Sequence, residues 1–240
     1  MTELLYLTDS YLKEFEATVV EDLGESVVLD RTAFYPGGGG QPNDTGYLEV
    51  DGERLEVLSV EKAENKVLHH VKHEESLLNV KVKGVINWPR RYTFMKYHTA
   101  IHLIDAVLRN YYGKAFLTGG QIYEDKARID VDFPELKREM LPELETRVNQ
   151  EISTGREVIV KFLSRDEAMN IPEIARTKPG QELLMKLDVV RVVEIVGLDA
   201  QMDGGTHVRN TREIGAIRMV KFENKGAHNK RIEFVLAGGL

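Results

Sequence analysis

The segment His98-Thr99-Ala100-Ile101-His102 carries two histidines four residues apart, in a stretch with helical periodicity. Side chains at positions i and i+4 project from the same face of a helix, so both imidazoles can reach one ion. Zinc-protease helices share this spacing, but they place a glutamate after the first histidine as general base. Here Thr99 occupies that position, which argues against a protease. Taken alone, the pair fits either two metal ligands or two histidines on a packed face.

Two further candidate metal ligands, Asp203 and His207, lie in the loop that follows the strand-like segment VRVVEIVG. A Gly-Gly pair between Asp203 and His207 lets the backbone turn both side chains toward one point. The chain has no cysteine, so a metal must be held by His, Asp, Glu or Gln. The combined donor set is His98, His102, His207 and Asp203. Three nitrogens and one oxygen suit a single four-coordinate Zn²⁺, or three ligands and a water.

A third stretch, RTAFYPGGGGQPNDTG over residues 31–46, contains four consecutive glycines after a strand-like segment. Glycine permits backbone conformations in which N–H groups approach an oxyanion or a phosphate closely. The Lys-Ser/Thr ending of a P-loop is absent. Pro36 and Pro42 stiffen the segment on both sides, which favours a binding loop over a floppy hairpin turn. The glycines that are candidate oxyanion donors are Gly38, Gly39 and Gly40.

The elements that must position these residues change in type along the chain. Short segments rich in Val, Leu and Ile, separated by turn signals, fill residues 1–88 and predict a small β-barrel or sandwich. Helical periodicity then predicts helices over 91–112, capped by Gly113, and over 135–153. Strands such as REVIVKFLS and VRVVEIVG, shorter helical segments and a final hairpin follow. We therefore predict an α+β protein, with an N-terminal β domain (1–88) and an α+β domain (89–240) whose sheet packs on helices.

Composition narrows the class of protein. The 240-residue chain has 42% hydrophobic residues and a net charge of −7, which indicates a folded protein that is not a generic nucleic-acid coat. No window is apolar enough for a membrane helix and the N-terminus lacks a signal pattern, so we expect a cytoplasmic protein. Basic residues still cluster at two places and are candidate phosphate contacts or ordinary solvated side chains. Those we single out are Arg91, Lys96, Lys225, Lys230 and Arg231.

Taken in order, FYPGGGGQPNDTG, HTAIH and DGGTHVRNTREIG resemble the editing half of alanyl-tRNA synthetase. They are more similar still to the free-standing alanyl-tRNA editing proteins of the AlaX type, and the glycine-rich N-terminal barrel indicates the medium-length class. The resemblance covers nearly the whole chain. It implies a trans-editing hydrolase that deacylates tRNA(Ala) mischarged with serine or glycine. No aminoacylation domain fits in 240 residues, so we expect neither tRNA charging nor a need for ATP.

The resemblance also implies roles for individual residues. The family's metal motifs correspond to His98, His102 and His207, but its usual Cys-Gly-Gly-Thr-His here begins with Asp203. The fourth ligand is therefore open between Asp203, Gln201 and a water, as is whether zinc binds the amino group or the water. The remaining implied roles concern the glycine-rich stretch at residues 31–46. Gln41 would orient substrate or water, and Thr32 would bond the serine hydroxyl unless it is an ordinary strand threonine.

Two readings compete with editing. A non-catalytic tRNA-binding module with a structural zinc would need a closed four-ligand shell, whereas catalysis uses an open position. A zinc hydrolase of small molecules would cleave esters without tRNA. The sequence does not reveal the oligomeric state. We expect three further histidines, His69, His70 and His73, to lie at the surface of a β segment.

Overall fold

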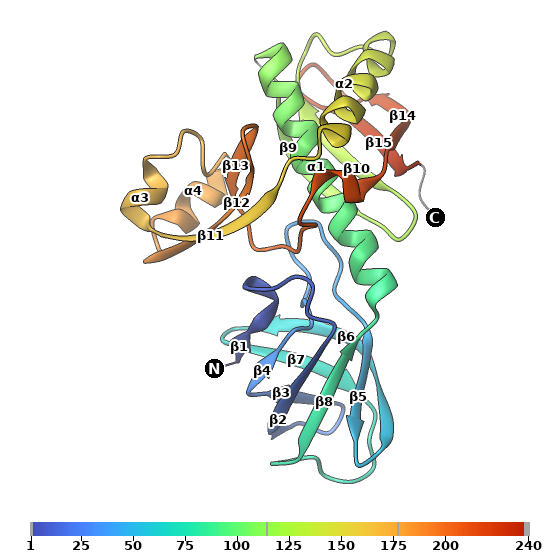
Figure 1. Ribbon diagram of the computed structural model, residues 1–240, viewed down its shortest axis with the longest axis vertical. Coiled ribbons are helices and arrows are strands. Elements are labelled where there is room, and N and C mark those ends of the chain that lie inside the picture. The colour runs from blue at the N-terminus through green and yellow to red at the C-terminus, as the bar shows by residue number, and fades with distance from the viewer. Residues whose placement is uncertain (1, 114, 177, 238–240) are drawn as a thin grey trace. The chain divides into compact units, whose positions relative to one another are not determined.

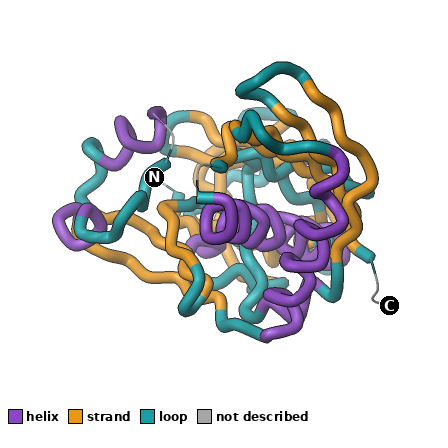
Figure 2. Tube along the Cα trace, turned by 90° about the horizontal axis from the view of Figure 1, so that it is seen from above, coloured by secondary structure: helices purple, strands orange, loops and turns teal. Residues whose placement is uncertain are grey.

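The computed structural model describes residues 2–113, 115–176 and 178–237 (Figure 1). Helices and strands are mixed along the chain, as the colouring of Figure 2 shows, and the α+β prediction is confirmed. The chain divides into two compact units, Met1–Phe94 and Met95–Leu240, which are described separately. None of the helices in the described part of the chain is long and apolar enough to cross a membrane.

The first unit is built around a closed six-stranded barrel, with strands hydrogen-bonded in the order β2-β3-β7-β6-β5-β8. Its strands alternate buried and exposed side chains, as the period of two requires when one face lines a core. A short parallel pair, β1 with β4, adds to the unit. The bounds are β1 (Glu3–Leu4), β2 (Glu14–Asp22), β3 (Ser26–Leu29), β4 (Arg31–Thr32), β5 (Gly46–Val50), β6 (Glu53–Ala63), β7 (Lys66–Val71) and β8 (Lys81–Ile86), with a 3₁₀ turn η1 at Leu5–Leu7.

The second unit has two antiparallel sheets. The larger has the order β14-β15-β10-β9 and the smaller the order β11-β12-β13. Its strands are β9 (Phe116–Ile122), β10 (Ala127–Asp132), β11 (Val158–Ser164), β12 (Val189–Ile195), β13 (Asp199–Met202), β14 (Ile217–Asn224) and β15 (Lys230–Leu236). Its helices are α2 (Leu141–Thr154), α3 (Arg165–Met169) and α4 (Lys178–Leu184), with 3₁₀ turns η2 (Arg138–Met140) and η3 (Thr211–Ile214).

A 25-residue helix, α1, spans Trp88–Tyr112 and carries the histidine pair. It begins three residues before the predicted start because Pro89 suits the first turn of a helix, where its missing N–H is not needed. It ends as predicted. The Gly113 N–H bonds the Arg109 carbonyl at 2.9 Å, and Gly113 adopts a φ of +69°. The sequence therefore located this helix to within one turn.

Other boundaries differ from the predictions. The second helix starts at Leu141 rather than 135, because η2 precedes it and Pro142 lies in its first turn. Two strands, β9 and β10, were not predicted. Two glycines interrupt the apolar pattern of β9, whereas β10 has the alternation of a half-buried strand over only six residues. β13 occupies part of the segment that we expected to be a loop, where it pairs with β12.

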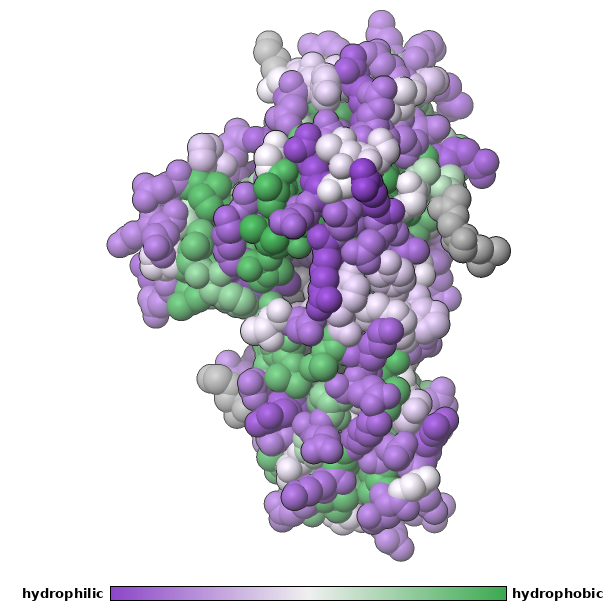
Figure 3. All heavy atoms as spheres, in the orientation of Figure 1, coloured by the Kyte–Doolittle hydropathy of each residue, from purple (hydrophilic) through white to green (hydrophobic). Residues whose placement is uncertain are grey.

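The lobe formed by α3, α4 and the smaller sheet has its own apolar core, which includes Ala168, Leu184 and Val192. Apolar residues also reach its surface, and Figure 3 shows hydrophobic colour there. Among them are the half-exposed Leu183, Met185 and Val189. Most of the rest of the face shown in Figure 3 is polar.

Candidate metal centre

The histidine pair lies on a buried face of α1. His98 is 4% exposed and His102 is 8% exposed, and their ring centroids are 5.1 Å apart. Helical spacing of four residues places one ring above the other, as the sequence predicts. Both Nε2 atoms face the Asp203 carboxylate, at 3.5 Å from His98 and 3.8 Å from His102.

The loop after β13 brings the remaining two donors to the same point. His207 is 4% exposed, and its Nε2 lies 3.0 Å from Asp203 Oδ2. Its ring centroid is 4.4 Å from that of His98 and 4.7 Å from that of His102. One donor atom from each of the four residues lies within 4.8 Å of the others. The structure thus brings together all four residues that the sequence singled out, and this group could hold a metal ion.

Gly205 makes this approach possible. A Cβ on Gly205 would lie 2.2 Å from His98 Cε1 and 2.4 Å from His98 Nδ1, closer than real contacts allow. Its N–H also donates to Asp203 Oδ2 at 2.6 Å. A Cβ on the neighbouring Gly204 would meet nothing within 4 Å. The second glycine of the pair is therefore the one that lets loop and helix pack together.

Thr99, which the sequence used only to argue against a protease, fixes the orientation of His207. Its hydroxyl donates to the Met95 carbonyl one turn back at 3.0 Å, so its oxygen is left to accept. It accepts from His207 Nδ1 at 3.1 Å and from the Val208 N–H at 3.2 Å. A histidine that binds a metal through Nε2 needs its proton on Nδ1, and Thr99 Oγ1 is placed to accept a hydrogen bond from it.

The donor set fits a cation. Burial lowers the pKa of His98, His102 and His207, to about 4 for His102, so the rings are neutral near pH 7. Burial raises the pKa of Asp203, but His98 and the bonded His207 outweigh it and hold that pKa well below its ordinary value. His207 Nε2 and Asp203 Oδ2 lie 3.0 Å apart, which is hydrogen-bond distance. Ligands of a tetrahedral zinc lie roughly 3.3 Å apart, close to the separations in this group.

Arg191 and Gln201 lie outside the group of four, and their hydrogen bonds differ. Arg191 donates from Nη1 to the Asp203 carbonyl at 2.7 Å and is 8% exposed. Gln201, the alternative fourth ligand, donates instead to Asp199 at 2.7 Å and to Asp105 at 3.3 Å. Its amide nitrogen is therefore committed to these carboxylates. Asp203 is the fourth residue of the group that the geometry brings together.

In the first unit, the glycine-rich loop is folded back on itself. Gly38 and Gln41 exchange backbone hydrogen bonds of 3.0 and 2.9 Å, and Tyr35 Oη donates to the Gly38 carbonyl. Glycines 37 to 40 all have φ between +56° and +135°, which explains why side chains are excluded there. Because the Gly38 N–H is used within the loop, the predicted oxyanion role falls on Gly39 and Gly40. Gln41 is 2% exposed.

A buried ion pair anchors the base of this loop. Arg91 is 0% exposed, and its guanidinium binds both oxygens of Asp44 and the carbonyls of Ser10 and Ala33. Asp44 in turn accepts the Tyr35 N–H at 2.7 Å. Arg91 thus has no exposed surface for a phosphate. Its prediction as a tRNA-binding residue is wrong, because a run of basic residues in sequence does not reveal which one meets a buried acid.

The other basic residues that were predicted to contact tRNA lie in the second unit and differ in their exposure and partners. Lys230 is 4% exposed and its Nζ donates to Asn224 at 2.7 Å, so its prediction as a phosphate contact is also contradicted. Arg231 is partly exposed and makes two bonds to Asp130. Lys225 is 39% exposed beside Glu223, and Lys96 is half-buried. Lys96, Lys225 and Arg231 remain candidates.

Thr32 is also buried in the first unit, with 0% exposure. Its Oγ1 lies 2.8 Å from His69 Nε2 and accepts the Phe34 N–H at 3.1 Å. His69 is 0% exposed, so the expectation of a surface position is wrong for it, since β7 turns it into the barrel. His70, on the outward face of the same strand, pairs with Glu61.

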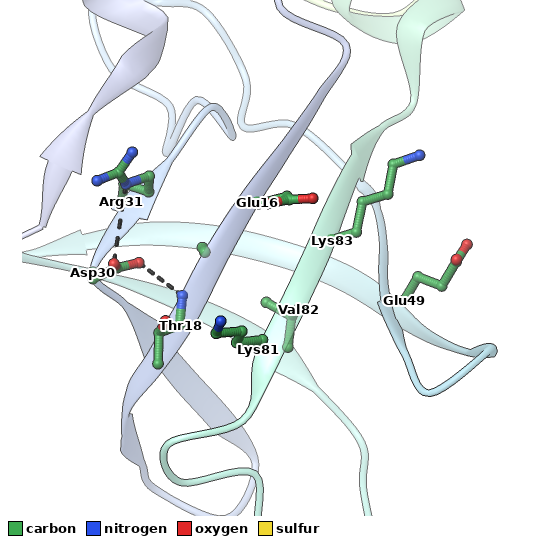
Figure 4. Close-up of a pocket in the computed structure, with 9 residues that line it drawn as sticks. Glu16, Thr18, Asp30, Arg31, Glu49, Lys81, Val82 and Lys83 are labelled. Carbon is green, nitrogen blue, oxygen red and sulfur yellow. Dashed lines mark hydrogen bonds and ion pairs between the residues drawn. The ribbon is translucent and has the colours of Figure 1, made fainter.

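A separate depression of about 590 Å³ lies on the barrel surface and contains none of the predicted site residues (Figure 4). Its lining mixes charges of both signs. Asp30 accepts the Thr18 N–H and pairs with Arg31, as the dashed lines in Figure 4 show. Lys83, also on its rim, pairs with Glu14. Arg31 and Lys83 are thus each engaged with an acidic side chain.

Two segments of the chain match models of protein families. Residues 3–90 match the family "tRNA synthetases class II (A)". Residues 190–233, which include Asp203 and His207, match the "Threonyl and Alanyl tRNA synthetase second additional domain". These matches, with the barrel and the histidine group, define the class: a relative of the editing parts of tRNA synthetases.

Whole-chain relatives specify the family. The alanyl-tRNA editing protein AlaX-M of Saccharolobus solfataricus is 45% identical, across 98% of this chain and 99% of that protein. The protein of the same name from Methanosarcina barkeri is 41% identical, across 98% and 99%. The alanine–tRNA ligase of Thermococcus kodakarensis is 38% identical, but 97% of this chain corresponds to 25% of the ligase. The chain belongs to the AlaX-M family of alanyl-tRNA editing proteins and is an aminoacyl-tRNA deacylase.

Sequence reasoning missed four residues that shape these sites. Thr99, Gly205 and Arg191 support the histidine group, and His69 contacts Thr32. Only Gly205 gave a signal, as part of the Gly-Gly pair. The others became visible through contacts between residues more than 10 positions apart in the chain.

Proposed function

We propose that this chain deacylates Ser-tRNA(Ala), and also Gly-tRNA(Ala), in a reaction that depends on one Zn²⁺ held by His98, His102, His207 and Asp203. The observation that carries the proposal is the buried group of three neutral imidazoles and one carboxylate within 4.8 Å, in a chain of this family. When bound, the ion would supply Lewis-acid chemistry, either polarising a water or anchoring the α-amino group.

Serine selection follows from the energetics of buried polar groups. A synthetase pocket cannot strongly reject an isostere that merely adds a hydroxyl, or the smaller glycine, so a second sieve is needed. In this proposal Thr32 bonds the serine hydroxyl, and alanine leaves that bond unmade. An unmade buried hydrogen bond costs about 1–3 kcal/mol, which penalises hydrolysis of the correct product by about 5- to 160-fold.

The remaining roles concern positioning. Gln41 orients the ester or the attacking water, and the amides of Gly39 and Gly40 donate to the oxyanion that forms on the ester carbonyl. Lys96, Lys225 and Arg231 contact phosphates of tRNA(Ala), with Arg231 exchanging part of its bond to Asp130. A closed, purely structural zinc site is the rival. The identification of the family as deacylases favours the catalytic proposal.

The test measures ester loss from Ser-tRNA(Ala) together with bound zinc, for wild-type protein and for His98→Ala. We expect His98→Ala to lose zinc and to slow deacylation by more than about 100-fold, since even outer-shell partners of a metal contribute 10- to 100-fold. His228→Ala is the control, because His228 is 76% exposed and pairs with Asp132. Equal activity of His98→Ala and wild type, or cleavage of a small seryl ester as fast as the tRNA ester, would contradict the proposal.

A further inference from the structure

His69 is a buried titratable group that the proposed chemistry does not use. It lies on β7 with 0% exposure, and both ring nitrogens have partners. Nδ1 lies 3.2 Å from the Val27 carbonyl oxygen, and Nε2 lies 2.8 Å from Thr32 Oγ1. The Phe34 ring packs edge-on against it, with centroids 5.5 Å apart. The ring is thus held in one orientation.

These contacts determine where the protons lie. Burial lowers the pKa of His69 to about 4, so the ring is neutral near pH 7 and carries one N–H. A carbonyl oxygen can only accept, so that proton must be on Nδ1, facing Val27. Nε2 then has a lone pair, and the 2.8 Å contact is a hydrogen bond donated by the Thr32 hydroxyl.

The polarity of Thr32 follows from this. A hydroxyl has one proton and two lone pairs. The proton is given to His69, and one lone pair accepts the Phe34 N–H at 3.1 Å. Among the described residues no further donor contacts Thr32 Oγ1. The side chain is 0% exposed, so the residues that cover it must move when a substrate group reaches this oxygen. One acceptor position of this oxygen is left for an incoming donor.

We infer that His69 is a positioning residue for substrate selection, which turns the Thr32 proton away so that Thr32 offers the substrate only a lone pair. The inference rests on the proposed function, in which Thr32 meets the serine side chain. Serine satisfies the lone pair because its hydroxyl can donate. A side chain of similar size that can only accept places one lone pair against another and is refused, as is alanine.

The experiment compares tRNA(Ala) chemically acylated with serine, 3-fluoroalanine, 2-aminobutyrate and alanine. Fluorine replaces the hydroxyl with an acceptor of similar size, and the methyl of 2-aminobutyrate neither donates nor accepts. We expect wild-type kcat/KM to favour serine over 3-fluoroalanine by about 10-fold or more, the effect of one buried hydrogen bond. In His69→Leu the Thr32 proton is released toward the substrate, so this preference should fall by about 10-fold.

Two variants distinguish an effect of His69 on the orientation of the Thr32 hydroxyl from a purely structural effect. His69→Gln can return an acceptor near the position of Nε2 and should restore the preference for serine over 3-fluoroalanine. His70→Leu, on the opposite face of the same strand, should leave it unchanged. A purely structural role for His69 would slow all four esters equally and leave the ratio at its wild-type value in His69→Leu. That result would overturn the inference.

The tautomer itself can be measured in wild-type protein, without dependence on how variants fold. Long-range ¹H–¹⁵N spectra of the histidine rings should show the His69 proton on Nδ1, and a proton on Nε2 would overturn the inference. Thr32→Val separates the two proposals. A lowered serine/alanine ratio in Thr32→Val with an unchanged ratio of serine to 3-fluoroalanine in His69→Leu rejects only the role of His69. An unchanged serine/alanine ratio in Thr32→Val rejects the Thr32 contact and the role of His69 with it.

Discussion

Each of the two units buries histidine, and the surroundings of the rings differ. In the second unit, His98, His102 and His207 surround the Asp203 carboxylate, and one potential ligand atom from each residue lies within 4.8 Å of the others. In the first unit, His69 has a carbonyl acceptor on one side and a hydroxyl donor on the other. The first arrangement could hold a metal ion, whereas in the second each ring nitrogen has a hydrogen-bond partner. The partners of the two nitrogens, rather than burial, decide what a histidine can do.

The largest effect on this difference between the units is expected when the candidate metal ligands of the second unit are moved apart. Gly205→Ala places a Cβ where His98 lies and should displace both His98 and the Asp203 loop. If each displaced ligand contributes about 100-fold, zinc affinity should fall by more than about 1000-fold. Gly204→Ala is the matched control, since its Cβ meets nothing within 4 Å. Zinc competition with a chelator measures both, and equal affinities would contradict the close approach.

The chemistry of Asp203 can be tested by exchange. Asp203→Ala removes one of four donors and should weaken zinc by at least about 100-fold, together with deacylation. Asp203→Cys supplies a thiolate at the same position and should retain the metal, because zinc accepts sulfur and oxygen ligands alike. Bound zinc and Ser-tRNA(Ala) deacylation are measured for each. If Asp203→Ala keeps its zinc, three histidines and a water hold the ion.

The burial of His69 in the first unit should make the free energy of unfolding depend on pH. The unfolded chain binds a proton on His69 below about pH 6.5, but the folded protein does not until about pH 4. The free energy of unfolding should therefore fall as pH drops through this window, by about 2.5 kcal/mol between pH 7 and pH 4.5. Urea unfolding followed by the signal of the barrel measures this. His69→Gln should lose that part of the pH dependence. An identical pH profile in the variant would show that His69 does not cause the loss of stability at low pH.

The smallest expected effect concerns the partner of His207. Thr99→Val removes the acceptor for its Nδ1–H and should weaken zinc by about 10- to 100-fold without removing a ligand. Thr93→Val on the same helix is the control, since Thr93 makes the same bond to the carbonyl four residues back, to Pro89, and is exposed. Zinc affinity that is unchanged in Thr99→Val would show that the ring is oriented by packing alone.

The sequence predicted the local features of this fold. Helical periodicity located α1 and its end at Gly113, and short apolar segments indicated the β-rich first unit. β9, whose apolar pattern is broken by two glycines, escaped prediction because its stability comes from its neighbour in the sheet. The same limit explains Arg91 and Lys230, since neither burial nor a distant partner such as Asp44 is visible in a run of basic residues.

By itself, the sequence determined the three candidate histidine ligands and the family. Residue types and the i, i+4 spacing of His98 and His102 depend only on local geometry, and long shared motifs identify relatives. Only the tertiary structure decided that the carboxylate of Asp203 completes the group and that Thr99 orients His207. It also decided that His69 holds the proton of Thr32. These are properties of contacts between segments far apart in the chain, and such contacts form only when the core packs.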